Sequence, residues 1–503
     1  MKLQPTKCMI AICAILLFAI PSLAQRVHQE LKEYQSLRLQ IKYGTDLYEL
    51  APGKIVPGNH AVQVDYSCPG MKWLKVSVTS VLCKATAGKV VSHKVSISSV
   101  QKPDRDLTFY FPVNTASDTL WYPLKSGVGK SIPSPGKNNG AVYRCAGKWD
   151  KQEHDLAIPL AVYSRDGGNA AVMTDPYFSS TFRNGYVYWT YAKEVGLEDA
   201  VEERTIVEAF NTGTPDDIIG VYYKEVLKDI PAGPRWLKDI AMVSYDYMSD
   251  SGRGWFNDID SLVKIVPVAD RSKILLNLHG WYDYVGRYCF NAKTGKLDRE
   301  WHSRLMKGTI TMSDLHRRIA YAKDRGFKVA LYFADGIISG DKLDDYAADK
   351  TIEGGGWSGP DVLGNTYRRN IATREYYDFY RNYAAALFAE FGKEADMFVW
   401  DDTFYITAGH LGTEQHRAYL DRTFMRLVKE ITAKLHEVNP DAAFMTSDLI
   451  CPVNYSFAAF ADVPPYSLVA DGTYQYSHGV PEFWSYGIFP NYRNVLWSFN
   501  WSS

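Results

Sequence analysis

Several short apolar runs in the C-terminal half of the chain each end in an acidic residue, and no other feature constrains the fold as strongly. The acidic ends are Asp246, Asp335, Asp401–Asp402, Asp448 and Asp471. In a parallel barrel the C-terminal ends of all strands open onto one face. The pattern therefore predicts a barrel whose acidic side chains converge on one pocket.

Amphipathic stretches separate these runs. One covers about 314–325, with Ser313 expected as its N-cap and Gly326 at its end, and another covers about 414–438 and stops before Asn439–Pro440. Alternation of strands and helices specifies a parallel sheet, and the length favours a (β/α)8 TIM-type barrel. The strand-like runs are centred near Val243, Leu276, Leu331, Val399, Met445, Val469 and Leu496. Since these are one fewer than the fold requires, either one strand escapes the count or the barrel lacks its last βα unit.

The N-terminal half has a different texture, in which short alternating segments from about 42 to 209 are broken by Pro-Gly, Asp-Gly-Gly and Asn-Asn-Gly turns. This pattern predicts an antiparallel β-sandwich. We expect four parts in the chain: a signal peptide at 1–24, the sandwich at 25–220, a linker helix at 221–236 and the catalytic barrel at 237–503.

The first residues carry Lys2 and Lys7, then the apolar run Met9–Ile20, then small residues up to Ala24. This order is typical of a secretory signal peptide, with cleavage expected after Ala24. The apolar run is too short for a permanent span, which needs ~20 residues. We therefore expect an exported protein, periplasmic or extracellular, without a permanent membrane span.

The composition of the chain limits the kinds of molecule that it is expected to bind. A formal net charge of −1 and the lack of any Lys/Arg-rich run argue against nucleic acid. Aromatic residues make up 14% of the chain, which suits sugar binding and equally suits Tyr-rich sheets. After the signal, the cysteines show no C-x-x-C pair, so free thiols are favoured over disulfides, and neither a metal nor a cofactor is expected. The cysteines are Cys68, Cys83, Cys145, Cys289 and Cys451.

Paired acids at Asp401 and Asp402 fit glycosidic bond cleavage. The reaction needs one group to protonate the leaving oxygen and a second carboxylate to attack the anomeric carbon or to activate water. Neighbouring strand residues face opposite sides, so only one of the two acids should point into the pocket. The alternative is that one or both cap the following helix or pair with arginine.

A β-sandwich joined through a linker helix to a barrel whose fourth strand ends in Trp400-Asp401 resembles the α-galactosidase-like clan of glycoside hydrolases. This clan includes families 27, 31 and 36 and the endo-α-N-acetylgalactosaminidase-like enzymes. The resemblance implies that Asp401 is the nucleophile of a retaining mechanism and that Asp471 is the general acid/base. Asp448 and Glu482 remain rivals for the acid. In retaining enzymes the two carboxyl groups lie about 5 to 5.5 Å apart.

Further residues near the strand ends could contact an oligosaccharide or polysaccharide substrate. The candidates are Asp246, His279, Trp281, Asp335, Trp400, Asp402, Asp448 and Trp497. A histidine satisfied at the barrel rim, and tryptophans that pack in the barrel, are equally good readings. The leading hypothesis is a retaining glycoside hydrolase that acts on galactose- or N-acetylgalactosamine-type α-glycans. The alternatives are a non-catalytic carbohydrate-binding protein with an incomplete barrel, and a barrel hydrolase of another clan with inverting chemistry.

Overall fold

The computed structural model describes residues 29–446 with gaps, and three short strands beyond them. The gaps are 84–87, 102, 114–118, 123–129, 134–140, 146–154, 157, 166–167, 184, 192–200, 214, 229–232, 248–253, 304–306, 341–345, 354–361, 363, 402 and 404–413. The three strands are β29 (Ser467–Leu468), β30 (Tyr474–Gln475) and β31 (Leu496–Asn500). The expected signal peptide and the candidates Asp402, Asp448, Asp471 and Glu482 lie outside the described residues.

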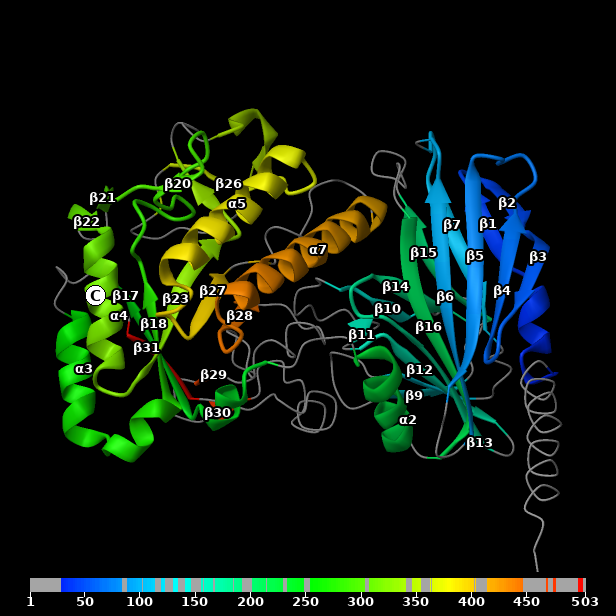
Figure 1. Ribbon diagram of the computed structural model, residues 1–503, viewed down its shortest axis with the longest axis horizontal. Coiled ribbons are helices and arrows are strands. Elements are labelled where there is room, and N and C mark those ends of the chain that lie inside the picture. Colours follow the sequence, from blue (N-terminus) through cyan, green and yellow to red (C-terminus); the bar gives the residue numbers. More distant parts are fainter. Residues whose placement is uncertain are drawn as a thin grey trace, which may run out of the picture.

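The N-terminal half forms two large sheets (Figure 1). The first runs β11 (Asp155–Leu156), β10 (Ala141–Tyr143), β14 (Ser180–Arg183), β15 (Tyr186–Tyr191), β7 (Leu107–Pro112), β1 (Gln40–Tyr43), β2 (Asp46–Glu49). The second runs β3 (Ala51–Pro57), β4 (Ala61–Ser67), β5 (Leu74–Cys83), β6 (Lys89–Ser99), β16 (Val201–Thr212), β13 (Gly168–Thr174), β12 (Leu160–Arg165), β8 (Thr119–Tyr122), β9 (Lys130–Pro133). Neighbouring strands are antiparallel except β10 and β11.

Alternating side chains of these sheets share one core. Val76 and Val78 of β5 are buried together with Phe109 and Phe111 of β7, and the ring of Phe111 lies 5.1 Å from that of His93 on β6. This is the period-2 burial that packs two sheets face to face. The predicted sandwich is therefore present.

The C-terminal half is built on a parallel sheet. Its order is β28 (Ala443–Thr446), β27 (Met397–Asp401), β23 (Lys328–Asp335), β18 (Ile274–His279), β17 (Met242–Tyr247) and β31. All five pairings are parallel, and β31 lies beside β17. A closed parallel barrel places its last strand beside its first. The final run of the chain therefore has the neighbour that a last barrel strand would have.

Helices cover one face of this sheet. They are α3 (Gly254–Ile265), α4 (Met312–Lys323), α5 (Arg374–Phe391) and α7 (Glu414–Val438). The predicted helix at 414–438 is confirmed, and its apolar positions Leu420, Phe424, Leu427, Ile431 and Leu435 are fully buried. The predicted N-cap of α4 was wrong. Thr311, not Ser313, caps the helix, because its hydroxyl accepts from Asp314 N at 3.2 Å while the Asp314 carboxylate accepts from Thr311 N.

Shorter elements complete the described structure. The helical turns are η1 (Lys32–Ser36), α2 (Pro215–Val221), η2 (Tyr222–Val226), η3 (Arg235–Asp239), η4 (Val268–Lys273) and η5 (Ala348–Lys350). Small sheets pair β19 (Phe290–Asn291) with β20 (Lys296–Leu297), β21 (Glu300–Ser303) with β22 (Gly308–Thr311), β25 (Thr351–Glu353) and β24 (Ile338–Ser339) with β26 (Thr366–Arg369), and β29 with β30. The four described cysteines of the chain, Cys68, Cys83, Cys145 and Cys289, are free thiols. Among the described helices we find none with the length and apolarity needed to cross a bilayer.

Candidate active site

Asp401 is the last residue of β27, the fourth strand of the parallel sheet counted from β17. Strand alternation places it on the same face as Met397 and Val399, away from the helices. The strand is buried up to Trp400, and Asp401 is half-buried at its end. A carboxylate at this position sits where the apolar interior of the sheet gives way to the open end of the strands.

Trp400 faces the other way. Its side chain is fully buried, and its ring lies 4.6 Å from Tyr380 of α5 and 5.2 Å from Phe424 of α7. Trp281 is also fully buried, and its indole N–H donates to the Tyr332 carbonyl oxygen at 3.0 Å. Both tryptophans therefore take part in packing, and neither side chain is exposed to solvent.

Tyr332 makes the most direct contact with Asp401. It lies on the adjacent strand β23, and its hydroxyl donates to Asp401 Oδ2 at 2.9 Å. The ring is held rigidly because Tyr332 is 1% exposed and packs edge-on against His279 at 3.8 Å. A register shift between Tyr332 and Ala334 marks a bulge beside Asp401. Bulges of this kind re-aim side chains next to active sites.

His279 ends β18, the strand on the far side of β23, and it is buried against Tyr332 and Tyr282. Burial lowers the pKa of His279 to about 3, and the negative charge of Asp401 offsets only part of this fall. The imidazole is therefore neutral at ordinary pH. In this state it can donate or accept a hydrogen bond, but it carries no charge to balance Asp401.

The remaining predicted residues are placed only by their backbone. Asp335 is paired in register with Asp401, and Asp246 lies near the end of β17, so both strand ends belong to the same edge of the sheet. Trp497 is paired with Val243, close to the other end of β17, so its strand position is away from that edge. Within the described residues, no group of three or more His, Cys, Asp or Glu side chains could hold a metal ion.

Sequence reasoning missed Tyr332. Alternation could have indicated it, because Ala330 and Tyr332 share a face of β23, and Val399 and Asp401 share a face of the neighbouring strand β27. What the letters did not reveal is the bulge, which changes the register between the two strands just before Asp401.

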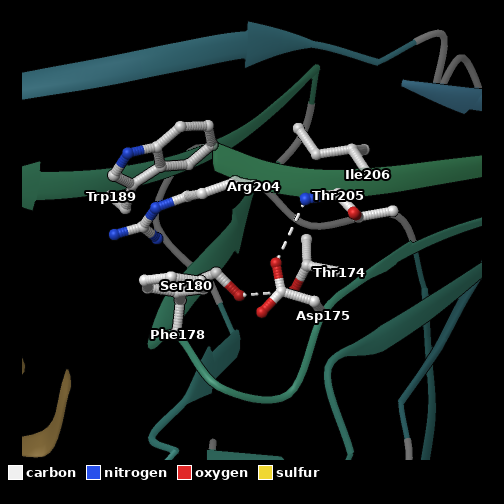
Figure 2. A pocket seen from close by; sticks show the side chains of 8 residues that line it. All are labelled: Thr174, Asp175, Phe178, Ser180, Trp189, Arg204, Thr205 and Ile206. Carbon is white, nitrogen blue, oxygen red and sulfur yellow. Dashed lines mark hydrogen bonds between the residues drawn. The ribbon is translucent and has the colours of Figure 1, made fainter. Parts of the chain in front are cut away.

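A small cavity lies elsewhere, in the β-sandwich (Figure 2). Its polar lining includes Arg204, whose guanidinium lies 4.4 Å from the Phe178 ring and 4.5 Å from the Trp189 ring. Across the cavity, Asp175 accepts from Thr205 N at 3.1 Å, and burial raises the pKa of Asp175 to about 6. The Arg204 guanidinium thus lies over the rings of both Phe178 and Trp189 in this cavity.

Known proteins share this architecture. No protein family and no curated protein matches the chain by sequence. Among solved structures, the GH36 α-galactosidase AgaA from Geobacillus stearothermophilus matches with a TM-score of 0.52 at 10% identity, over 84% of this chain and 64% of that enzyme. AgaB from the same organism matches with a TM-score of 0.52 at 10% identity, over 84% of this chain and 63% of that chain. The galactosidase domain of the α-galactosidase-sucrose kinase AgaSK matches with a TM-score of 0.51 at 10% identity, over 85% and 63%.

At this identity the likeness concerns the fold, and the chain spans just under two thirds of the length of AgaA. The match covers both the sandwich and the parallel sheet, since it extends over 84% of the chain. The chain thus shares its overall fold with these GH36 structures.

Proposed function

We propose that the protein is a retaining glycoside hydrolase that cleaves α-linked galactose- or N-acetylgalactosamine-type glycans. The observation that carries this proposal is Asp401, a half-buried carboxylate at the end of the fourth parallel strand that is oriented by the Tyr332 hydroxyl. The fold likeness to α-galactosidases supports the substrate class, and AgaA variants have been solved with raffinose and stachyose.

In this mechanism Asp401 attacks the anomeric carbon while an acid gives its proton to the leaving oxygen. The bond from the anomeric carbon to that oxygen breaks, and a covalent glycosyl-enzyme forms. Water then attacks the same carbon, the conjugate base of the acid takes the water proton, and Asp401 leaves as a carboxylate. Asp471 is the proposed acid, and Asp448 and Glu482 are its rivals.

His279 is assigned a binding role. A side chain with a pKa of about 3 holds no acidic proton near neutral pH, so it cannot serve as the general acid. Its position beside Tyr332 suits a neutral hydrogen bond to a sugar hydroxyl. Asp246 and Asp335 are proposed to bind further hydroxyl groups at the same edge of the sheet.

The test is hydrolysis of aryl α-galactosides, aryl α-N-acetylgalactosaminides, raffinose and stachyose by the wild-type chain and by Asp401→Asn. We expect activity in the wild type and a loss of at least 10³-fold in the variant, because removal of a covalent nucleophile leaves only binding and acid catalysis. The control is Asp298→Asn, a substitution at an exposed residue outside the parallel sheet. Full activity in Asp401→Asn would remove Asp401 from the mechanism.

A second candidate function is carbohydrate binding without hydrolysis. It follows from the sequence, in which the strand-like runs are one fewer than a (β/α)8 barrel requires. Sugar binding by calorimetry, with no product released across the same glycan panel, would support it. An inverted anomeric configuration of the first product, seen by NMR, would instead point to the chemistry of another clan.

We further propose that residues 1–24 are a signal peptide and that the mature chain acts outside the cytoplasm, with the domain boundaries expected from the sequence. N-terminal sequencing of the exported protein should begin at Gln25. A mature chain that retains Met1 would contradict export by cleavage.

A further inference from the structure

We propose that the β-sandwich positions the catalytic strand through helix α7, with Glu202 and Arg422 as positioning residues. This inference rests on the proposed role of Asp401. It concerns the junction between the two halves of the chain, which the mechanism above does not use.

Helix α7 connects the two regions. It is the next described helix after Asp401 along the chain, and it ends before β28, so it joins two neighbouring strands of the parallel sheet. In Figure 1 it runs from β27 and β28 toward the strands of the sandwich. Its buried residues Phe424, Leu427 and Ile431 bind it to the parallel-sheet half, while its earlier part reaches the sandwich.

The contacts with the sandwich are polar and specific. The Arg422 guanidinium forms an ion pair with the Glu202 carboxylate of β16, and the two side chains are only 15% and 16% exposed. The same guanidinium lies 5.6 Å from the Tyr191 ring of β15. Next to it, Asp421 is 1% exposed and accepts from the Ser179 hydroxyl at 3.3 Å. These bonds fix the helix in rotation as well as in distance.

The sandwich side of the junction is rigid. The Tyr191 hydroxyl accepts from the Trp189 indole N–H at 2.9 Å, and the Arg204 guanidinium lies 5.5 Å from the centroid of the Tyr191 ring. Figure 2 shows Arg204 held beside Trp189 and Phe178, and its guanidinium also donates to the Ser179 carbonyl oxygen at 3.3 Å. Tyr191 and Ser179, the residues that α7 contacts, are thus both braced by Arg204.

A nearly buried ion pair is a poor source of stability, because desolvation of both charges offsets their attraction. The ion pair instead restrains the relative positions of β16 and α7, since both charges must stay paired. Among the residues that the structure describes, none forms a hydrogen bond with the Glu202 Oε2 atom, so in this part of the chain the carboxylate is balanced by Arg422. A small displacement of α7 could in turn displace Asp401 at the end of β27, and a displacement of about 1 Å at a nucleophile can cost about 10²-fold in rate.

The experiment compares Glu202→Gln and Arg422→Met with a matched control, Glu203→Gln. Glu203 is the next residue of β16 and pairs with Lys94 at 2.7 Å, but these side chains are 50% and 54% exposed and face away from α7. We expect kcat to fall about tenfold or more in both junction variants with KM within twofold of wild type. The control should stay within twofold in both parameters. The charge-swapped protein Glu202→Arg/Arg422→Glu should recover most of the lost kcat.

Hydrogen exchange supplies a readout that does not require activity. Faster amide exchange is expected in Met397–Asp401 and in α7 of the junction variants, with no change in Ile274–His279. Unchanged kcat and unchanged exchange in folded junction variants would overturn the proposal. If a single variant fails to fold, the charge-swapped protein is tested instead, because it should keep both kcat and amide exchange close to the wild-type values. If the wild type hydrolyses no α-glycoside, the proposed function fails, and exchange alone still decides whether the sandwich holds the strand of Asp401.

Discussion

Replacing Tyr332 by phenylalanine removes one hydroxyl group from the candidate site and leaves the ring that packs against His279. The lost interaction is the 2.9 Å hydrogen bond to Asp401 Oδ2. Hydrogen bonds to charged groups contribute about 1.5–3 kcal/mol. If the catalytic step depends on this bond, kcat/KM should fall by roughly 10- to 100-fold, since 1.36 kcal/mol corresponds to about tenfold in rate.

The direction follows from the geometry. Without the hydroxyl, the half-buried carboxylate loses the donor that fixes its orientation, and the carboxylate that must leave in the second step is less well stabilised. Steady-state kinetics on an aryl α-galactoside measure the effect, and pre-steady-state kinetics show whether the glycosyl-enzyme accumulates. We expect slower formation of that intermediate, which lowers kcat/KM, and slower breakdown of it, which lowers kcat.

Tyr383→Phe is the matched control. Tyr383 is also fully buried, but its hydroxyl donates to the Phe333 carbonyl oxygen at 2.6 Å on the helix-covered face. This variant should lose stability, by about 1 kcal/mol for a neutral hydrogen bond, and keep its kcat/KM. The reasoning is refuted if Tyr332→Phe retains kcat/KM within twofold of wild type, or if Tyr383→Phe loses as much activity.

Three further outcomes are expected. Burial lowers the pKa of His279 in the folded state to about 3 from 6.5, so on acidification the unfolded chain binds a proton first and stability is lost as the pH falls from 6.5 toward 3. His279→Gln should therefore show a smaller drop in melting temperature between pH 7 and pH 4.5 than the wild type. An equal drop would contradict this reasoning. The Asp396 carboxylate pairs with Lys323 and Lys328 at 2.7 and 2.8 Å and accepts from Val329 N. Asp396→Ala should therefore lower the free energy of unfolding, measured with urea, by about 3 kcal/mol. A change under ~1 kcal/mol would argue that these contacts do not stabilise the fold. Thr311→Ala should cost about 1 kcal/mol through loss of the α4 cap, whereas Ser313→Ala should cost less than half as much in the same assay.

The periodic spacing of apolar residues in the sequence predicted those helices and strands in which one face is buried. The helix at 414–438 was bounded by its apolar spacing and by Asn439–Pro440, and the structure has the same bounds. Alternation indicated that neighbouring Asp401 and Asp402 face opposite sides, and in the structure Asp401 contacts Tyr332 while Trp400 before it packs on the helices. The cap of α4 was missed because both Thr311 and Ser313 can cap a helix, and only the reciprocal bond with Asp314 selects Thr311.

Contacts between distant segments could not be predicted from local pattern. Helix α5 was not anticipated, since its buried positions are mostly Tyr and Phe, which also fit strands. The pairing of β31 with β17 is long-range, so the sequence left open whether the last strand was missing. Tyr332 and Asp401 lie 69 positions apart on neighbouring strands, and the junction of Glu202 with Arg422 joins residues 220 positions apart.

The central claim is that Asp401 is the nucleophile of a retaining hydrolase. The most direct measurement is incubation with a fluorinated α-galactosyl fluoride, which forms a slowly hydrolysed glycosyl-enzyme, followed by peptide mass spectrometry. The account predicts a single adduct on the carboxylate of Asp401, in a peptide that contains Met397–Asp401. An adduct on another carboxylate, or turnover of α-galactosides without any covalent adduct, would contradict it.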